Sequence, residues 1–166
     1  MLRKGIEETA LFREYEPLLR AMGIVLVDIN ELDRGHTVVV TVVIMAKDED
    51  VHVDHCAAVY RLVYPRMELQ IGQKDLHLEV TTPGLQRTIK DVYEFGLFTG
   101  KRVRVYDASK SAWLSGIIKK CDETSLALDE VFIEDETEML ETMVVELAAI
   151  QKAKLDYRWE DNSHGN

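Results

Sequence analysis

The sequence predicts an α+β protein of two domains: a layer of helices on a mixed sheet, followed by a small β-barrel. Helix-like and strand-like segments alternate up to residue 81, whereas short strand-like segments crowd together after residue 100. Between the two patterns stands Thr82-Pro83-Gly84, a strong turn or linker signal. We expect residues 1–87 to form the α/β domain, residues 88–160 the barrel, and residues 161–166 a frayed tail.

The first domain should open with an amphipathic helix over residues 5–22. Its apolar residues recur at spacings of three and four, and Gly23 stands where a left-handed cap would end it. Pro17 lies inside this pattern and interrupts its hydrogen bonding. Residues 24–32 and 37–46 then have strand patterns, and Asp33-Arg34-Gly35-His36 between them has the composition of a hairpin turn.

A second helix and a third strand complete this domain. Asp54 is the expected N-cap of the helix, which should falter near Pro65. Residues 75–81 alternate again, with Leu76, Leu78 and Val80 on one face. The order helix–strand–strand–helix–strand predicts a mixed sheet with both helices packed on one face.

The second domain should begin with a short helix over residues 91–98, closed by Gly100. Short strands are expected at tight spacing over residues 101–106, 112–120, 125–128, 141–145 and 152–157. Five such strands in so short a stretch favour a small barrel over a sandwich, because a barrel hides its strand edges.

Composition restricts the class of protein. The chain has 166 residues, 46% of them hydrophobic, and a net charge of −10. The longest run without charge, residues 37–46, is roughly half of what a membrane-spanning helix needs. Glutamates in the first twenty residues argue against a secretory signal. Cys56 and Cys121 suit free thiols in a reducing compartment, so a cytoplasmic protein is expected.

The charge is unevenly distributed. Residues 101–120 contain one acid, Asp107, against the bases Lys101, Arg102, Arg104, Lys110, Lys119 and Lys120. Residues 122–146 contain no Lys or Arg, and their acids are Asp122, Glu123, Asp129, Glu130, Glu134, Asp135, Glu136, Glu138, Glu141 and Glu146. A basic patch beside an acidic face suits a partner made of both protein and nucleic acid.

Motifs of common enzymes are missing from the sequence. It contains no P-loop, Gly-x-Gly-x-x-Gly, His-Glu-x-x-His or Gly-x-Ser-x-Gly. The paired acids fall in segments predicted as turns and lack a basic neighbour that would separate their pKa values. The candidate metal ligands His52, Asp54, His55 and Cys56 have no second cluster to complete a zinc site. We therefore expect no catalytic residues and no metal site.

Two segments offer candidate contacts. In a strand, Arg102 and Arg104 would share the outer face while Val103 and Val105 fill the barrel, leaving the guanidinium groups to bind phosphate. Tyr106 and Trp113 could add stacking surface. The second segment is the junction of Glu79, Thr82, Pro83, Gly84 and Leu85, where Arg87 either joins the domains through Glu79 or a carbonyl group or reaches outward to phosphate.

Residues 78–87, Leu-Glu-Val-Thr-Thr-Pro-Gly-Leu-Gln-Arg, closely resemble the Leu-Glu-Val-Ser-Ser-Pro-Gly-Leu-Asp-Arg-Pro signature of the bacterial ribosome maturation factor RimP family. Asp54-His55-Cys56-Ala57 resembles the Asp-Asp-Cys-Ala that opens the family's second helix. Similar matches are found at residues 98–103, 113–118 and 150–155, so the resemblance spans roughly residues 5–157. The sequence departs from the family at Gln86, Thr88 and Tyr60, and its segment 131–142 is longer and more acidic than the usual hairpin.

The resemblance implies a non-catalytic factor that binds the free small (30S) ribosomal subunit and assists its late assembly. It also implies a C-terminal barrel similar to SH3 or Sm folds and no cofactor. From the short uncharged run we expect no membrane partner. Under this hypothesis Arg87, Lys101, Arg102 and Arg104 contact rRNA phosphate, and the acidic surface meets basic ribosomal proteins. We expect a monomer.

Two alternatives remain open from the sequence. A free-standing Sm-like RNA-binding module would bind isolated RNA and form ring-shaped oligomers. A metal-dependent hydrolase would use the residues between His52 and Cys56. Neither alternative accounts for the match along the whole chain.

Overall fold

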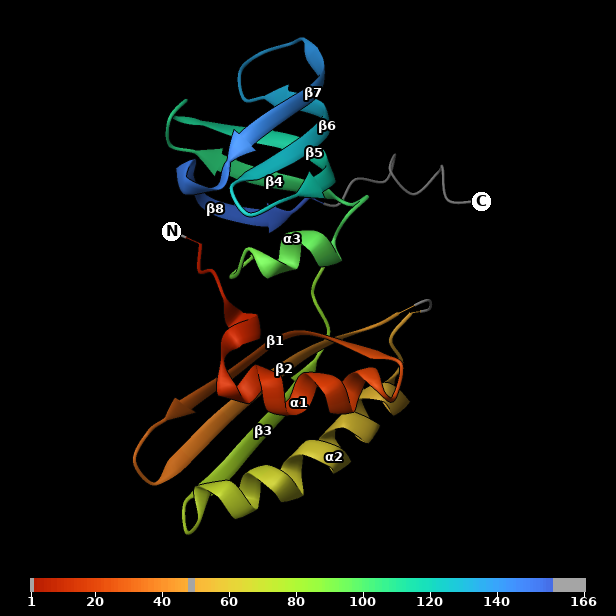
Figure 1. Ribbon diagram of the computed structural model, residues 1–166, viewed down its shortest axis with the longest axis vertical. Helices are drawn as coiled ribbons and strands as arrows, with labels where there is room; N and C mark the ends of the chain where they lie inside the picture. The colour runs from red at the N-terminus through yellow and green to blue at the C-terminus, as the bar shows by residue number, and fades with distance from the viewer. Residues whose placement is uncertain (1, 48–49, 157–166) are drawn as a thin grey trace. The chain divides into compact units, whose positions relative to one another are not determined.

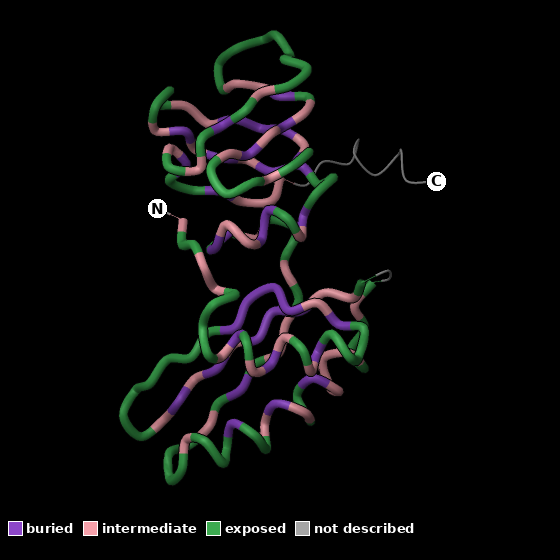
Figure 2. Tube along the Cα trace, viewed as in Figure 1, coloured by how far each residue is buried: buried purple, intermediate pink, exposed green. Residues whose placement is uncertain are grey.

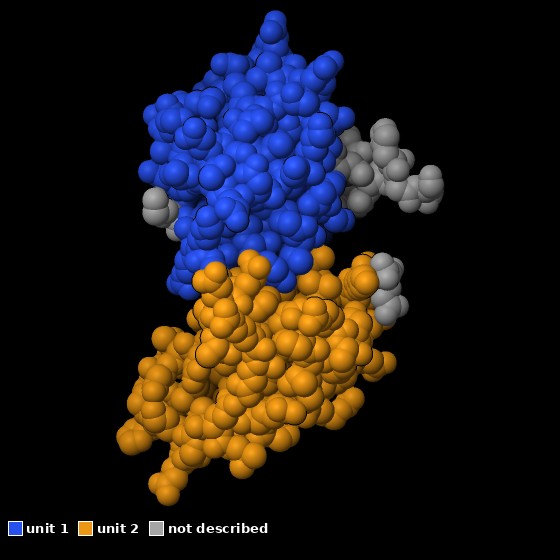
Figure 3. Space-filling view, viewed as in Figure 1, with its two compact units in different colours: residues 1–5, 84–166 blue, residues 6–83 orange. Residues whose placement is uncertain are grey.

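The chain divides into two compact units, which Figure 3 colours separately. One unit comprises residues 6–83, and the other comprises residues 84–166 together with residues 1–5. A computed structural model describes residues 2–47 and 50–156. The expected tail at residues 161–166 and the end of the last expected strand, Tyr157, lie outside these ranges.

The unit of residues 6–83 is a three-stranded sheet with two helices (Figure 1). A short 3-10 helix, η1 (Ile6–Glu8), precedes α1 (Ala10–Arg20), and the strands are β1 (Ile24–Asp33), β2 (Thr37–Ala46) and β3 (Asp75–Thr81). Helix α2 (Val53–Ile71) connects β2 to β3. The sheet order is β1-β2-β3, with β1 antiparallel and β3 parallel to β2. The predicted element order and mixed sheet are confirmed.

Local chemistry explains the ends of the first helix. The Thr9 hydroxyl accepts a hydrogen bond from the Phe12 N–H at 3.3 Å, so Thr9 caps α1. Gly23 has a φ of +75°, the left-handed conformation expected after the helix. The single predicted helix over residues 5–22 is therefore a 3-10 turn followed by a shorter α-helix.

Two expectations for α2 are wrong. The N-cap is His52, and Asp54 lies inside the first turn, where its negative charge is favourable at the helix N-terminus. The helix also continues through the exposed Pro65. Val63 and Met67, on either side of the proline, are buried, and this tertiary packing offsets the hydrogen bond that proline cannot donate.

Burial alternates along the strands of this sheet (Figure 2). Val38, Val40 and Val42 are buried in β2, and Leu78 is buried beside Val40 in β3. The opposite face of β3 carries the exposed His77 and Glu79. Helix α1 packs along β1 and α2 along β3, so the apolar face forms the core of this unit.

The second unit contains a five-stranded antiparallel sheet. After the short helix α3 (Tyr93–Leu97) come β4 (Arg102–Asp107), β5 (Ala112–Cys121), β6 (Ser125–Ile133), β7 (Met139–Glu146) and β8 (Ile150–Leu155), with a 3-10 turn, η2 (Leu147–Ala149), before β8. The order is β7-β6-β5-β4-β8. All five strands were expected, but β6 is longer than predicted, since its pairing with β5 continues past a register shift at Glu130, which has a φ of +50°.

The two edges of this sheet differ. Segment 87–89 runs beside β8, where the Ile89 N–H donates to the Ala153 carbonyl and the Leu155 N–H to the Arg87 carbonyl. In the described part of the chain, β7 pairs with β6 alone. Since no pairing joins β7 to β8 there, the closed barrel stays a prediction.

The cysteines and helices bear on the expected class. Cys56 and Cys121 are free and half-buried. Burial, with the nearby charge of Asp122, raises the pKa of the Cys121 thiol and so favours its protonated form. No helix in residues 2–47 or 50–156 has the length and apolar character to cross a bilayer.

Candidate nucleic-acid interface

A basic groove of about 620 Å³ lies on the second unit. Four cations line it, namely Arg3, Lys90, Lys152 and Lys154, together with Trp113, Leu2, Thr88, Ile89, Gln151 and Ala153. Among residues 2–47 and 50–156, no acidic residue lines the groove. Cations arranged along a groove with an aromatic ring have the chemistry that binds a phosphodiester chain and its bases.

Strand register brings the groove residues together on one face of the sheet. Lys154 pairs with Arg104, which pairs with Ser115; in the next row Lys152 pairs with Tyr106, which pairs with Trp113. Directly paired residues of antiparallel strands point to the same side. Val103, Val105 and Ala153 alternate with them and are buried on the other side.

The aromatic rings of this face are held by their neighbours. Tyr106 and Trp113 meet edge to face with centroids 5.5 Å apart. The guanidinium carbon of Arg104 lies 4.9 Å from the centre of the Trp113 ring, a cation–π arrangement that keeps the charge beside the aromatic surface. A smaller hollow of about 250 Å³ adjoins these residues and is also lined by Phe132, Glu134 and Asp156.

The groove cations have little competition from acids. Within residues 2–47 and 50–156, Arg3, Lys152 and Lys154 form no ion pair. Arg104 lies 3.8 Å from Glu134, with both side chains partly exposed. A pair of that geometry contributes little, so Arg104 can exchange Glu134 for a phosphate at small cost.

Arg102 was expected on the outer face with its guanidinium group exposed, and this expectation is wrong. Its side chain is only 4% exposed. Nη1 donates to the Glu130 carbonyl at 3.2 Å, Nη2 lies 3.4 Å from a Glu130 carboxylate oxygen, and the group stacks over Phe132. The irregularity at Glu130 in β6 places Glu130 and Phe132 against the guanidinium group of Arg102. Arg102 therefore links β4 to β6.

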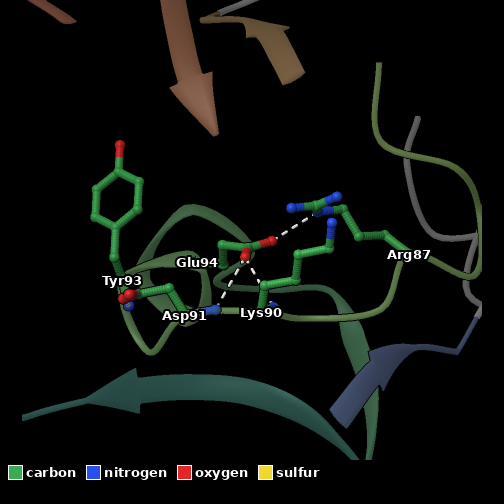
Figure 4. Close-up of polar contacts among 5 residues, drawn as sticks. All are labelled: Arg87, Lys90, Asp91, Tyr93 and Glu94. Carbon is green, nitrogen blue, oxygen red and sulfur yellow. Dashed lines mark hydrogen bonds and ion pairs between the residues drawn. The ribbon is translucent and has the colours of Figure 1, made fainter. Parts of the chain in front are cut away.

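Arg87 forms an ion pair with Glu94 (Figure 4). Its Nε lies 2.6 Å from Glu94 Oε1, and both side chains are buried. The other oxygen of Glu94 accepts hydrogen bonds from the backbone N–H groups of Lys90 and Asp91. A buried carboxylate held by three donors fixes segment 87–94, which also runs beside β8.

The other residues expected to form contacts or the domain junction do not gather at one site. Lys101 is exposed, and its carbonyl group accepts from the Ile118 N–H, so it does not line the groove. The division between the units falls between Pro83 and Gly84, where Thr82, Gly84 and Leu85 are exposed and Glu79 lies in β3. The Arg87 N–H closes a turn on the Gly84 carbonyl group.

The segment from His52 to Cys56 does not assemble a metal site in the structure. Among the residues described, no group of three or more His, Cys, Asp or Glu side chains could hold a metal ion. His55 instead uses Nδ1 to accept a hydrogen bond from the His52 N–H at 2.9 Å, and the two rings stack. His52 is the N-cap of α2 and His55 lies in its first turn, so this hydrogen bond caps the helix.

Most of the groove was missed from the sequence. Lys152 and Lys154 alternate with the buried Ala153 just as Arg102 and Arg104 alternate with valines, so the same period of two could have identified them. Arg3 and Lys90 had no such signal. They are brought together by a parallel bridge between Arg3 and Asp91, in which the Arg3 N–H donates to the Lys90 carbonyl.

Comparisons with known proteins found a matching family and several similar solved structures. Residues 14–86 match a family described as the RimP N-terminal domain, which confirms the resemblance found from the sequence. Several solved structures match about two fifths of the chain. An Sm-like (LSm) protein from Methanococcus vannielii is 24% identical over 39% of this chain and 92% of its own, with a TM-score of 0.36.

Two further solved structures also match about two fifths of this chain at low sequence identity. An Sm-like protein from Archaeoglobus fulgidus is 18% identical, with 37% of this chain and 87% of its own covered and a TM-score of 0.34. A heptameric Sm-like protein from Pyrobaculum aerophilum is 20% identical, with 40% and 92% covered and a TM-score of 0.35. TM-scores this low give these likenesses no weight for function.

Proposed function

Because residues 14–86 match the RimP N-terminal domain family, we propose that this chain is a ribosome maturation factor that binds the free small subunit and assists its late assembly. The observation that supports contact with the subunit is the basic groove of the second unit. The proposed role is non-catalytic and needs no cofactor, and the proposed location is the cytoplasm.

The groove is the proposed rRNA contact. Arg3, Lys152 and Lys154 supply charges for phosphates, and Arg104 adds a planar donor group beside Trp113. Each phosphate contact releases condensed counterions, so binding through the groove should weaken as salt rises. Lys101, the residue before β4, stays a proposed additional contact. For Arg87 and Arg102 we propose support of the groove from within, through their buried partners.

The acidic surplus is the proposed source of selectivity. A net charge of −10 repels naked nucleic acid at long range and disfavours RNA that offers phosphate alone. A ribosomal particle also presents basic proteins, and the acidic segment 122–146 suits these. The proposed partner is therefore rRNA together with basic ribosomal proteins.

We also propose that the second unit is a small SH3-like barrel left open between β7 and β8, and that the chain is a monomer. Segment 87–89 occupies the outer edge of β8. A head-to-tail ring built by strand pairing would need that edge on every copy. This observation disfavours the ring expected of a free-standing Sm-like RNA-binding module.

Co-sedimentation of the purified chain with free small subunits, large subunits and assembled ribosomes tests this function. The expected result is selective pelleting with free small subunits, weakening as salt rises. Pelleting with none of these particles, together with tight binding to naked RNA and a ring-sized peak on a sizing column, would replace it with the Sm-like alternative.

A further inference from the structure

Strand β7 is an edge strand with an unusually apolar surface. Within residues 2–47 and 50–156 only β6 pairs with it, so alternate backbone N–H and C=O groups face outward along β7. Met139, Leu140 and Val144 are 50%, 37% and 64% exposed. In β1, β3 and β8, the strands that end the strand orders of the two sheets elsewhere, the one large apolar side chain so exposed is Leu32.

Negative charge surrounds this edge. The six acids in and just before β7 are all exposed, namely Glu134, Asp135, Glu136, Glu138, Glu141 and Glu146. Glu134 lies 3.8 Å from Arg104, whereas the other five acids form no ion pair within residues 2–47 and 50–156, and residues 122–146 contain no Lys or Arg. Natural sheets use lysine, proline or β-bulges to prevent their edge strands from pairing with another chain. Strand β7 contains neither lysine nor proline.

The charge decides which strand could pair here. A second copy of the chain would bring the acids of its own β7 against Glu138, Glu141 and Glu146, and like charges placed opposite each other destabilise strand pairing. RNA phosphate is repelled for the same reason. An extended polypeptide rich in Lys or Arg would gain both backbone hydrogen bonds and opposite charges.

We propose that the outer edge of β7 binds an extended basic segment of a partner protein by strand addition. Backbone pairing to β7 supplies the affinity, Met139, Leu140 and Val144 supply apolar contacts, and the surrounding acids select Lys or Arg. This inference rests on the proposed function for the source of the segment, a protein of the small subunit. The segment itself is defined by its chemistry.

The test uses a capped peptide about ten residues long that alternates Lys and Val, the length of an ordinary strand. Calorimetry measures its affinity for the whole chain, and amide hydrogen exchange locates it. We expect binding that protects amides of residues 139–146. A peptide with the same side chains but methylated on alternate backbone nitrogens keeps its charges and cannot pair, so it should bind at least about tenfold more weakly.

Two protein variants with equal charge changes complete the test. Glu138→Lys with Glu141→Lys should weaken the peptide about tenfold. Glu7→Lys with Glu8→Lys, at two exposed acids of the other unit, should leave it within about twofold. Glu138→Gln with Glu141→Gln removes the two charges without reversing them and should weaken peptide binding by an intermediate factor. This variant keeps the proposal testable if the double lysine variant folds poorly.

Several results would overturn the proposal. If the methylated and unmethylated peptides bind with equal affinity, the interaction depends on charge and not on strand pairing. Protection outside β7, equal weakening by both lysine pairs, or a dimer of the free chain that Glu138→Lys and Glu141→Lys dissociate would each assign the edge to something else. No ribosomal particle enters this assay, so its outcome is separate from that of the co-sedimentation.

Discussion

Asp107 shows how a single buried carboxylate shapes the turn between β4 and β5. Its Oδ1 accepts hydrogen bonds from the N–H and the hydroxyl group of Ser109, and its Oδ2 lies 3.1 Å from Lys110 Nζ. Burial pushes the pKa of Asp107 upward, but the hydrogen bonds from Ser109 and Lys110 outweigh it and hold the pKa below its ordinary 3.8.

Replacing Asp107 with Asn should therefore destabilise the chain by about 1–2 kcal/mol at neutral pH. Because the folded-state pKa is lowered, this stabilisation is present above the unfolded pKa and is lost as the pH falls through the folded one. Urea denaturation of both proteins from neutral pH to about pH 3 measures the difference between their free energies of unfolding. This difference should be constant down to about pH 4 and should become smaller below it. A difference that persists in acid would contradict this assignment.

Arg102 and Arg104 show what the sequence can and cannot predict about single residues. Their alternation with Val103 and Val105 correctly placed the valines in the core. It could not distinguish the two arginines, because the difference arises from Glu130 and Phe132 on another strand. The ion pair of Arg87 with Glu94 was missed for a similar reason: Glu94 lies seven residues ahead, within a segment folded back on itself.

At the scale of elements, the strands were predictable because alternation of apolar residues is a local property. Strands β2 and β3 have the expected ends, residues 37–46 and 75–81. The errors occur where tertiary packing overrides a local rule, as in α2, which passes through Pro65. Pairing of segment 87–89 with β8 was not predictable, since a run this short has no periodicity.

Gly116 offers a test of how closely β5 and β6 pack. A Cβ atom at this position would lie 2.9 Å from Leu128 Cβ and 3.2 Å from both the Asp129 carbonyl oxygen and Val131 Cγ2. We expect Gly116→Ala to destabilise the chain by about 1–3 kcal/mol, because these closely packed neighbours must move.

Gly96→Ala is the matched control, since a Cβ at Gly96 in α3 would meet nothing within 4 Å. It should be neutral or slightly stabilising, because alanine favours a helix. Equilibrium denaturation compares the two variants. If Gly116→Ala unfolds at the same denaturant concentration as Gly96→Ala, the close approach of β5 and β6 is wrong.

For the whole molecule, the central feature is the separation of charge within the second unit. The groove carries Arg3, Lys90, Lys152 and Lys154, while the acids gather from residue 122 to residue 146. The sequence predicted this asymmetry because charge runs are visible in a single chain. The groove itself was not predictable, since strand pairing and the Arg3–Asp91 bridge bring its cations together from distant segments.

The most direct test of the central claim is co-sedimentation of Lys152→Glu with Lys154→Glu on free small subunits across a salt series. The control, Lys119→Glu with Lys120→Glu, makes the same charge change at exposed residues outside the groove. We predict that the groove variant loses about tenfold or more in affinity and that its dependence on log salt becomes shallower by about two units, while the control keeps both. Equal affinity and equal salt dependence of wild type and the groove variant would contradict rRNA contact through the groove.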